Sequence, residues 1–411
     1  MLFKVKIVNK KRLLSKVTLI FILMIKINVL SQVDTVSNES PDKKWFQSFS
    51  ISGYVQIRYN GLFETNDKLN CDQCDKSWGG GGNFSIRRAR IIFSGQIHPQ
   101  LFFYVQPDFA SSIDGGKNFG QLRDAYFDIG LDKKNEFRFR IGQSKVPYSF
   151  ENLQSSRNRI SLDRNDGTNS SFTNERDLGV HFMWASTKRR ELFKYLVDSG
   201  LKGSGDYGVL TVGIINGQPL NTRELNKQKH VLFRAAYPFA IKNQIFEANI
   251  QAYSGMYRMM DEDISPGVKH NNDLNYKDER IGIGAVWYPK PFGIQAEYNI
   301  GNGPEFNKLT DSIETQSLSG GYIMLNYQLK LKNQLIIPFT KYKYYDGGKK
   351  FELDARSYHL EEFEVGVEWQ PIKYMEFVAM YTFSNRRYED YELHDNLQKG
   401  SLLRIQAQLN F

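Results

Sequence analysis

The feature that most constrains this chain is a two-residue hydrophobic period that recurs almost from end to end. The last segment shows it clearly, because residues 403–411 carry an apolar side chain at every second position, with Arg, Gln or Asn between them. A soluble sheet shows this period in a few strands, whereas about sixteen such segments in succession favour one closed sheet, apolar outside and polar inside. The sequence therefore predicts an all-β fold, a transmembrane antiparallel β-barrel of about 16 strands.

The connections between the expected strands alternate in length. The strands are expected at residues 48–63, 84–97, 101–110, 121–131, 136–146, 176–186, 207–216, 230–238, 244–256, 279–289, 292–302, 319–330, 335–345, 360–371, 375–384 and 400–411. Tight connections at 98–100, 132–135, 290–291, 331–334 and 372–374 alternate with long polar ones. Short periplasmic turns and long extracellular loops are typical of outer-membrane barrels, and an even strand count returns both termini to the periplasm.

Two features interrupt this regular pattern. The connection 187–206 is long where a short turn is expected, and its apolar residues at helical spacing predict a small helix there. Pro107 and Pro338 fall inside expected strands, although proline has no backbone N–H for the ladder. We expect both prolines at bulges or strand ends.

The first 31 residues have the composition of an export signal. Basic residues precede an apolar run of about 14 residues, interrupted by Lys26, and small residues stand before a possible cleavage site. A membrane-anchoring helix is the alternative, but it needs about 17 to 25 apolar residues. We therefore divide the chain into a signal peptide (1–31), a periplasmic lead-in (32–47) and a transmembrane barrel domain (48–411).

The expected surroundings follow from the barrel and its last residue. The final strand ends on Phe411 and resembles the signal read by barrel-assembly machinery. We expect that machinery and outer-membrane lipid as partners, and the outer membrane of a Gram-negative bacterium as the location.

Charge and residue usage exclude several function classes. The formal charge of +9 falls to +2 without the seven basic residues of 1–31, because 47 basic and 45 acidic residues remain, so nucleic-acid binding is not supported. The six histidines show neither a triad grouping nor metal spacing, so we expect no enzyme, no metal and no cofactor. Cys71 and Cys74 form a Cys-x-x-Cys whose favoured interpretation is a local disulfide, with redox or zinc sites less favoured.

The alternation also assigns side chains to the lumen. An arginine at the bilayer midplane on the lipid side costs roughly 2–4 kcal/mol, so the arginine faces of 84–97 and 136–146 should point inward. The expected lumenal residues are the basic Arg88, Arg90, Arg138 and Arg140 and the acidic Asp108, Asp124, Asp128, Glu362, Glu364 and Glu368. Arg123 shares the lipid-facing parity of its strand and is expected to meet lipid phosphates at the strand's outer end.

These lumenal charges have two interpretations. They can pair across neighbouring strands and hold the wall together. They can also line a polarised, water-filled channel whose charged walls filter ions. The two roles are compatible.

The loop Pro147 to Glu175 is the longest in the first half of the chain. Loops of this length are usually functional or mobile, and in a barrel too wide to be filled by its own side chains this one is expected to fold inside. Arg157 and Arg159 are then candidate constriction residues. The alternative is an exposed loop of mixed charge that has no function.

Several motifs together resemble one protein family. They are FSIRRARIIFSG (84–95), LRDAYFDIG (122–130), RIGQSKVPYSFE (140–151), ERDLG (175–179) and GIING (213–217). In order and spacing they resemble the phosphate-selective porins O and P, over nearly all of the chain after residue 31. The resemblance implies a sixteen-stranded outer-membrane porin, usually trimeric, whose inward-folded loops and arginine-rich lumen pass phosphate or related anions.

Carried over to this chain, the resemblance implies a set of pore-lining, anion-binding arginines. They are Arg88, Arg90, Arg138, Arg140, Arg157 and Arg159. The chain departs from the family in its charge balance, because the net +2 and the lumenal Asp124 and Asp128 predict weaker phosphate selectivity. We therefore expect a channel for passive diffusion of small anions. The alternatives are a general or weakly selective porin and a non-conducting structural or adhesive barrel.

Overall fold

The computed structural model describes residues 48–64, 83–113 and 116–411, and the strands among them form one antiparallel sheet. The strands are β1 (Phe49–Glu64), β2 (Asn83–His98), β3 (Leu101–Ile113), β4 (Gly116–Gly130), β5 (Phe137–Lys145), β6 (Arg176–Trp184), β7 (Leu210–Ile215), β8 (His230–Ile241), β9 (Gln244–Arg258), β10 (Asn275–Trp287), β11 (Phe292–Asn307), β12 (Ser312–Tyr327), β13 (Leu329–Leu331), β14 (Gln334–Gly348), β15 (Ser357–Ile372), β16 (Met375–Glu389) and β17 (Leu397–Asn410). The expected signal peptide, the lead-in up to residue 47, and Cys71 and Cys74 lie outside the described residues.

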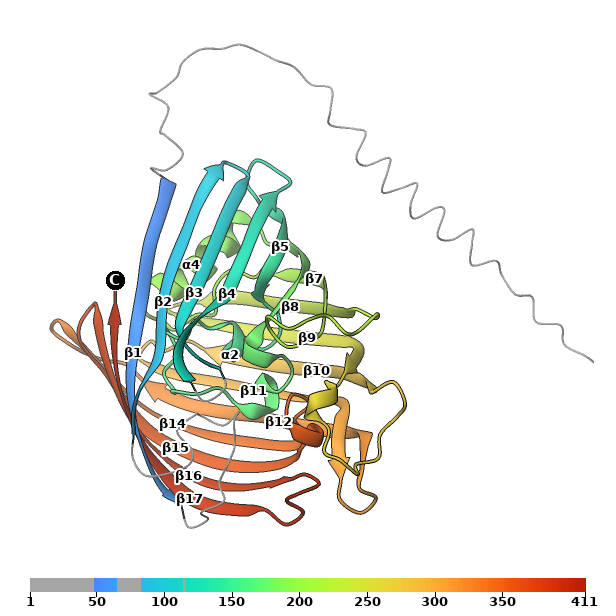
Figure 1. Cartoon of the computed structure of the whole chain (residues 1–411). Coiled ribbons are helices and arrows are strands. Elements are labelled where there is room, and N and C mark those ends of the chain that lie inside the picture. Colours follow the sequence, from blue (N-terminus) through green and yellow to red (C-terminus); the bar gives the residue numbers. More distant parts are fainter. Residues whose placement is uncertain (1–47, 65–82, 114–115) are drawn as a thin grey trace, which may run out of the picture. The chain divides into compact units, whose positions relative to one another are not determined.

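The sheet closes on itself, because β1 pairs with both β2 and β17 (Figure 1). The wall has 16 strands, since β12 and β13 are consecutive pieces of one strand that both pair with β14. The break lies at Tyr327 and Gln328, opposite Ile337 and Pro338, where the proline cannot donate to the ladder. The predicted fold, a closed antiparallel barrel of 16 strands, is confirmed.

Several strands run further than the sequence predicts at the end of the barrel that carries the long loops. β10 begins at Asn275 rather than 279, and β11 continues to Asn307 rather than 302. Here the outward side chains are polar, as at Lys277 and Glu279, whose side chains are 54% and 28% exposed. The wall therefore extends past the apolar band, where hydrophobic alternation no longer marks it.

The two faces of the wall differ as the alternation predicts. On β4 and β5, Phe127 and Phe137 are exposed on the outer face, whereas Asp128 and Arg138 are buried on the inner face. The expected lumenal residues on the strands, basic and acidic alike, are all buried inside the barrel.

Arg123 is an exception, and its predicted position on the outer wall is wrong. Gln106 of β3 pairs with Asp124, but the next residue, Pro107, pairs with Leu122, which leaves Arg123 as a β-bulge. The extra residue breaks the alternation, so Arg123 points inward and is 7% exposed. Pro107 therefore lies at a bulge, as predicted.

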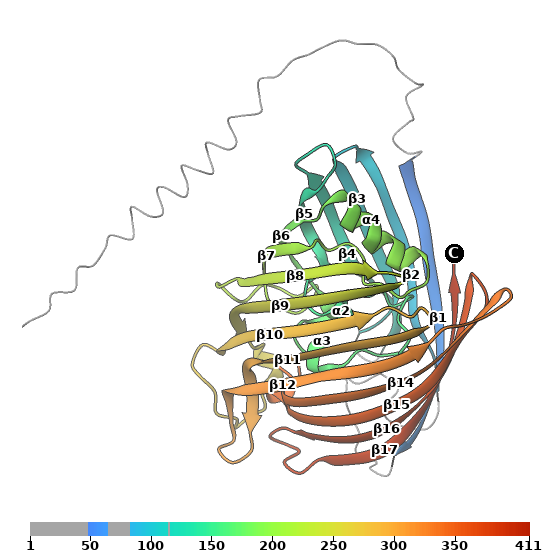
Figure 2. The ribbon, with the colours of Figure 1, turned by 180° about the vertical axis from the view of Figure 1, so that it is seen from behind.

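The helices lie within the ring of strands (Figures 1 and 2). Two short helices, α2 (Phe150–Leu153) and α3 (Asp166–Asn169), and the 3-10 turn η2 (Thr173–Glu175) belong to the loop after β5. The helix predicted in the connection 187–206 is α4 (Thr187–Asp198). The 3-10 turns η3 (Asp261–Asp263) and η4 (Leu353–Ala355) lie in the loops that follow β9 and β14. In the described part of the chain, none of the helices has the length and apolarity to cross a membrane.

Candidate functional site

The loop 147–175 is held inside the barrel by one buried carboxylate on β11. Glu297 accepts hydrogen bonds from the Ser149 hydroxyl (2.7 Å) and from the backbone N–H groups of Phe150 (2.6 Å) and Glu151 (3.0 Å). These donors belong to the start of α2, whose first N–H groups have no partner within the helix. The loop is thus fixed to the wall at its first turn.

Further along, the same loop binds the neighbouring strands. Arg280 of β10 donates to the Gly167 carbonyl (3.1 Å) and to the Ser170 hydroxyl (2.9 Å). Lys349, which follows β14, forms an ion pair with Asp166 (2.9 Å). The loop therefore lies inside the lumen against β10 to β14, and the alternative of an exposed loop is wrong.

The tip of the loop crosses to the opposite wall. Asp163 lies within ion-pair distance of Arg58 on β1 (3.2 Å) and binds Arg404 on β17. Gln56 of β1 donates to the Ser156 carbonyl (3.1 Å). On the side of the lumen bounded by β2 to β6, the described part of the loop leaves open space beside its contacts with the wall.

A second segment crosses the barrel at the short-turn end, which is the periplasmic end in outer-membrane barrels. We call residues 199–206, which follow α4, the strap. Lys202 of the strap forms ion pairs with Glu368 (2.5 Å) and Glu376 (3.6 Å) of β15 and β16. Gln328 also donates to the Gly200 carbonyl (2.9 Å). The strap therefore joins α4 to the opposite wall.

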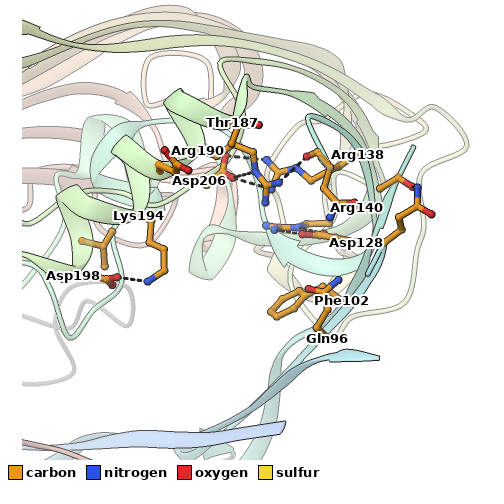
Figure 3. Close-up of a pocket in the computed structure, with 15 residues that line it drawn as sticks. Gln96, Phe102, Asp128, Arg138, Arg140, Thr187, Arg190, Lys194, Asp198 and Asp206 are labelled. Atoms are coloured by element: carbon orange, nitrogen blue, oxygen red, sulfur yellow. Dashed lines mark hydrogen bonds and ion pairs between the residues drawn. The ribbon is translucent and has the colours of Figure 1, made fainter. Parts of the chain in front are cut away.

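The strap ends at Asp206, which binds two arginines (Figure 3). Its carboxylate lies 2.8 Å from Arg138 of β5 and 2.9 Å from Arg190 of α4. Burial alone would raise the pKa of Asp206, but these two guanidinium groups lower it to about 2. Asp206 is therefore ionised at any physiological pH.

Two cavities remain along β2 to β6. The central cavity, of about 220 Å³, lies between this wall, the loop residues 153–158 and the strap. The short-turn cavity, of about 580 Å³, lies between the same wall and α4 (Figure 3). Both are lined by Arg140, Val197 and Asp206, so they adjoin one another.

Four ion pairs form a ladder along this side of the lumen. In each, an arginine binds an aspartate at hydrogen-bonding distance, and three of the four pairs lie on the wall itself. The pairs are Arg90 with Asp108 (2.6 Å), Arg176 with Asp124 (2.9 Å), Arg140 with Asp128 (2.8 Å) and Arg138 with Asp206 (2.8 Å). The expected acidic residues Asp124 and Asp128 thus neutralise arginines of the wall, as the pairing interpretation predicts.

The six arginines chosen from the sequence occupy different environments. Arg90, Arg140 and Arg157 line the central cavity, and Arg138 lines the short-turn cavity with Arg140. Arg88 and Arg159 are buried and line neither of these two cavities.

Three of the six have no carboxylate partner within ion-pair distance among the described residues: Arg88, Arg157 and Arg159. Arg88 donates to the Gln56 side-chain oxygen (2.8 Å), and Arg159 donates to the Leu162 carbonyl (3.1 Å). Their positive charge is therefore less compensated than that of the ladder arginines.

Sequence reasoning missed three cations on the same side. Arg176 bridges Asp124 and Glu175, and Lys145 donates to the carbonyls of Leu153 (2.9 Å) and Gln154 (2.6 Å). Arg123, the third, was assigned to the wrong face. Arg176 and Lys145 both have the lipid-facing parity of their strands, so the alternation assigns them outward, as it does Arg123. Only the contacts within the closed barrel reveal their inward positions.

The acidic side of the lumen is paired within the wall. Glu362 lies 2.5 Å from Lys343 and also binds Arg386, while Glu364 lies 2.8 Å from Lys343 and 3.3 Å from Arg404. Among the described residues, no cluster of three or more His, Cys, Asp or Glu side chains could hold a metal ion.

Comparison with known proteins assigns the family. The profile of the phosphate-selective porin O and P family matches residues 57–411. The chain belongs to this family. The protein is therefore an outer-membrane porin of Gram-negative type, and the family consists of channels rather than enzymes. A comparison with curated proteins finds no match.

Solved porin structures share the fold of this porin at low sequence identity. The outer-membrane channel DcaP of Acinetobacter baumannii aligns with a TM-score of 0.54 and 14% identity, over 88% of this chain and 97% of that one. An anion-selective porin from Comamonas acidovorans aligns with a TM-score of 0.52 and 10% identity, over 89% and 99%. The trimer form of OmpT from Vibrio cholerae gives the same four values.

Proposed function

We propose that this porin passes small anions, phosphate or related oxyanions, by passive diffusion along the β2 to β6 side of its lumen. The observation that carries the proposal is the lining of the central cavity, where five cationic side chains face two carboxylates. Arg157 and Lys145 are among the five, and no described carboxylate lies within ion-pair distance of either. The cavity therefore favours an anion over a cation.

The residue types suit an oxyanion. The planar guanidinium donates two parallel hydrogen bonds to adjacent oxygens and stays charged at working pH. Several such groups in succession can replace the hydration shell in steps without holding the ion too tightly. We propose that Arg88, Arg90, Arg138, Arg140, Arg157 and Arg159 contribute to this path.

The ladder supports a second candidate, a weakly selective porin. Four of the arginines on this side already have an aspartate partner, so the lumenal field is weaker than their number suggests. The two candidates differ in degree, and both conduct. A structural or adhesive barrel would give no channel.

We also propose the assembly suggested by the sequence. Residues 1–31 act as a cleaved signal, the strand ending at Phe411 engages barrel-assembly machinery, and the mature porin forms a homotrimer in outer-membrane lipid. The trimer form of OmpT supports the last point. Phe411 exchanges backbone hydrogen bonds with Gly53 of β1 (2.8 and 3.0 Å), so its removal should also weaken the closure of the barrel.

The test is the reversal potential of the purified porin in planar bilayers across a tenfold KCl gradient. We expect a reversal potential whose sign indicates anion selectivity. Arg157→Glu should shift the reversal potential toward the value for cation selectivity by roughly 10–20 mV, where the limit for a monovalent ion is ~59 mV. Phosphate should block the chloride current less in this variant, and in the double variant that also carries Arg159→Glu.

Arg387→Glu is the matched control, since its side chain is 49% exposed at the long-loop end of β16. It should leave the potential unchanged. A wild-type pore that prefers cations would refute the proposal, and folded protein without conductance would favour the structural barrel.

A further inference from the structure

Aromatic side chains lie beside the basic residues in both cavities. Tyr104, Tyr126 and Tyr207 line the central cavity, and Phe102 lines the short-turn cavity (Figure 3). Phe102 and Tyr104 lie two residues apart on the inner face of β3, Tyr126 faces Tyr104 from β4, and Tyr207 directly follows the strap. We call these four residues the aromatic strip.

The three tyrosine rings of the strip lie close together around Arg140. The ring centroids of Tyr104 and Tyr126 lie 5.1 Å apart with 14° between the planes. The guanidinium carbon of Arg140 lies 4.0 Å from the Tyr126 centroid and 5.3 Å from that of Tyr207. A solute in the central cavity therefore meets a cation and π-faces side by side.

The strip is not a packed core like the other lumenal tyrosines. Tyr288 and Tyr345 are fully buried, and their hydroxyls donate to Glu247 (2.6 Å) and to the Gly348 carbonyl (2.6 Å). The strip residues are only partly buried. Within the described chain, no hydrogen bond is made by the hydroxyl of Tyr126 or Tyr207.

The strand next to Tyr126 carries a glycine at the paired position. Its partner on β5 is Gly142, which has φ +126°. A Cβ atom there would lie 2.8 Å from the Tyr126 Cα and 2.3 Å from the Ala125 carbonyl oxygen, so no other residue fits. The inner face of β5 therefore carries no side chain at the point where the ring meets the cavity.

We propose that the preferred solute of this porin is an organic anion that joins an anionic group to a flat ring. The proposal rests on the anion path proposed above. The paired ladder arginines give a bare oxyanion limited compensation for its lost hydration, whereas a ring recovers contact with the aromatic strip. The anionic group lies near Arg157 and Lys145, and the ring lies against the three tyrosines of the aromatic strip.

The experiment compares two phosphate monoesters of equal charge on the full mature porin. Phenyl phosphate and methyl phosphate are each titrated into KCl bilayers, and the concentration that halves the chloride current is measured. Phenyl phosphate should reach half block at a concentration about three- to tenfold lower, the range expected for one aromatic contact.

Variants then assign the effect to the rings. Tyr126→Leu should reduce the ratio of the two half-block concentrations toward one, whereas Tyr126→Phe should keep it. Tyr207→Leu, outside the barrel wall, provides the same test if the wall variant fails to fold. Phe127→Leu, on the outer face next to Tyr126, should keep the ratio.

The reversal potential in the same bilayers separates this inference from the proposed function. If the pore is anion-selective and both esters block it equally, the proposed role of the aromatic strip is wrong and the proposed anion path stands. A ratio that survives Tyr126→Leu and Tyr207→Leu also overturns it. A cation-selective pore overturns both proposals.

Discussion

The change Glu297→Gln should release the loop that narrows the pore. In the native protein the Glu297 carboxylate accepts three hydrogen bonds from the first turn of α2, at 2.6 to 3.0 Å. A glutamine has one acceptor oxygen, and its amide N–H₂ would face a donor. Ser149 and Glu151 donate to Glu297 Oε2 and Phe150 donates to Oε1, so a glutamine with its oxygen in the Oε2 position loses one charge-assisted bond, which contributes about 1.5–3 kcal/mol.

The expected effect is a population shift. A loss of about 1.5–3 kcal/mol changes the equilibrium between the bound and displaced loop by roughly a factor of 10 to 10². Contacts further along the loop, such as Lys349 with Asp166 (2.9 Å), oppose complete release. We therefore expect the variant to alternate between the native conductance and brief openings of higher conductance.

Single-channel recording in planar bilayers measures this directly. Glu361→Gln is the matched control, because it makes the same change on an outward-facing side chain that is 46% exposed. It should behave as the wild type. Folded Glu297→Gln protein that shows only the native conductance would mean that the other contacts hold the loop and that the anchor assignment is wrong.

Three further changes test other parts of the lumen. Arg123→Gln should move the reversal potential a few millivolts toward cations, because Arg123 points inward; an unchanged potential would place it on the outer wall. Lys202→Met leaves Glu368 and Glu376 without their cation and should weaken strap attachment by about 3–5 kcal/mol. Faster proteolysis within 199–206 would reveal this, and native resistance would contradict it. The pKa of Asp206 lies below its ordinary 3.8, so its stabilising contribution is complete above about pH 4 and is lost as the pH falls through about 2. Conductance should therefore stay constant from pH 7 to pH 4, and Asp206→Asn at pH 7 should reproduce the low-pH channel.

The sequence by itself determined the architecture of this porin. Sixteen segments with a two-residue period correspond to the sixteen strands of the wall, although several continue past the apolar band. The inward positions of Arg88 and Arg138 were predictable as well. The reason is local: lipid imposes a cost on each outward charge, so the alternation within a single strand records which face meets lipid.

Pairing within the lumen was decided only by the tertiary structure. Arg138 is neutralised by Asp206, 68 residues away, and Asp163 binds Arg404 from the other end of the chain. Which arginines keep an uncompensated charge depends on such distant contacts, and strand periodicity carries no information about them.

The position of Arg123 shows the same limit on a smaller scale. Its parity within β4 places it on the outer wall, and a single unpaired residue opposite Pro107 turns it inward. Parity is a property of one strand, whereas a bulge is a property of two paired strands. The loop anchor at Glu297 and the strap are likewise products of the closed barrel, because only closure brings β11, β15 and β16 to segments that follow β5 and β6.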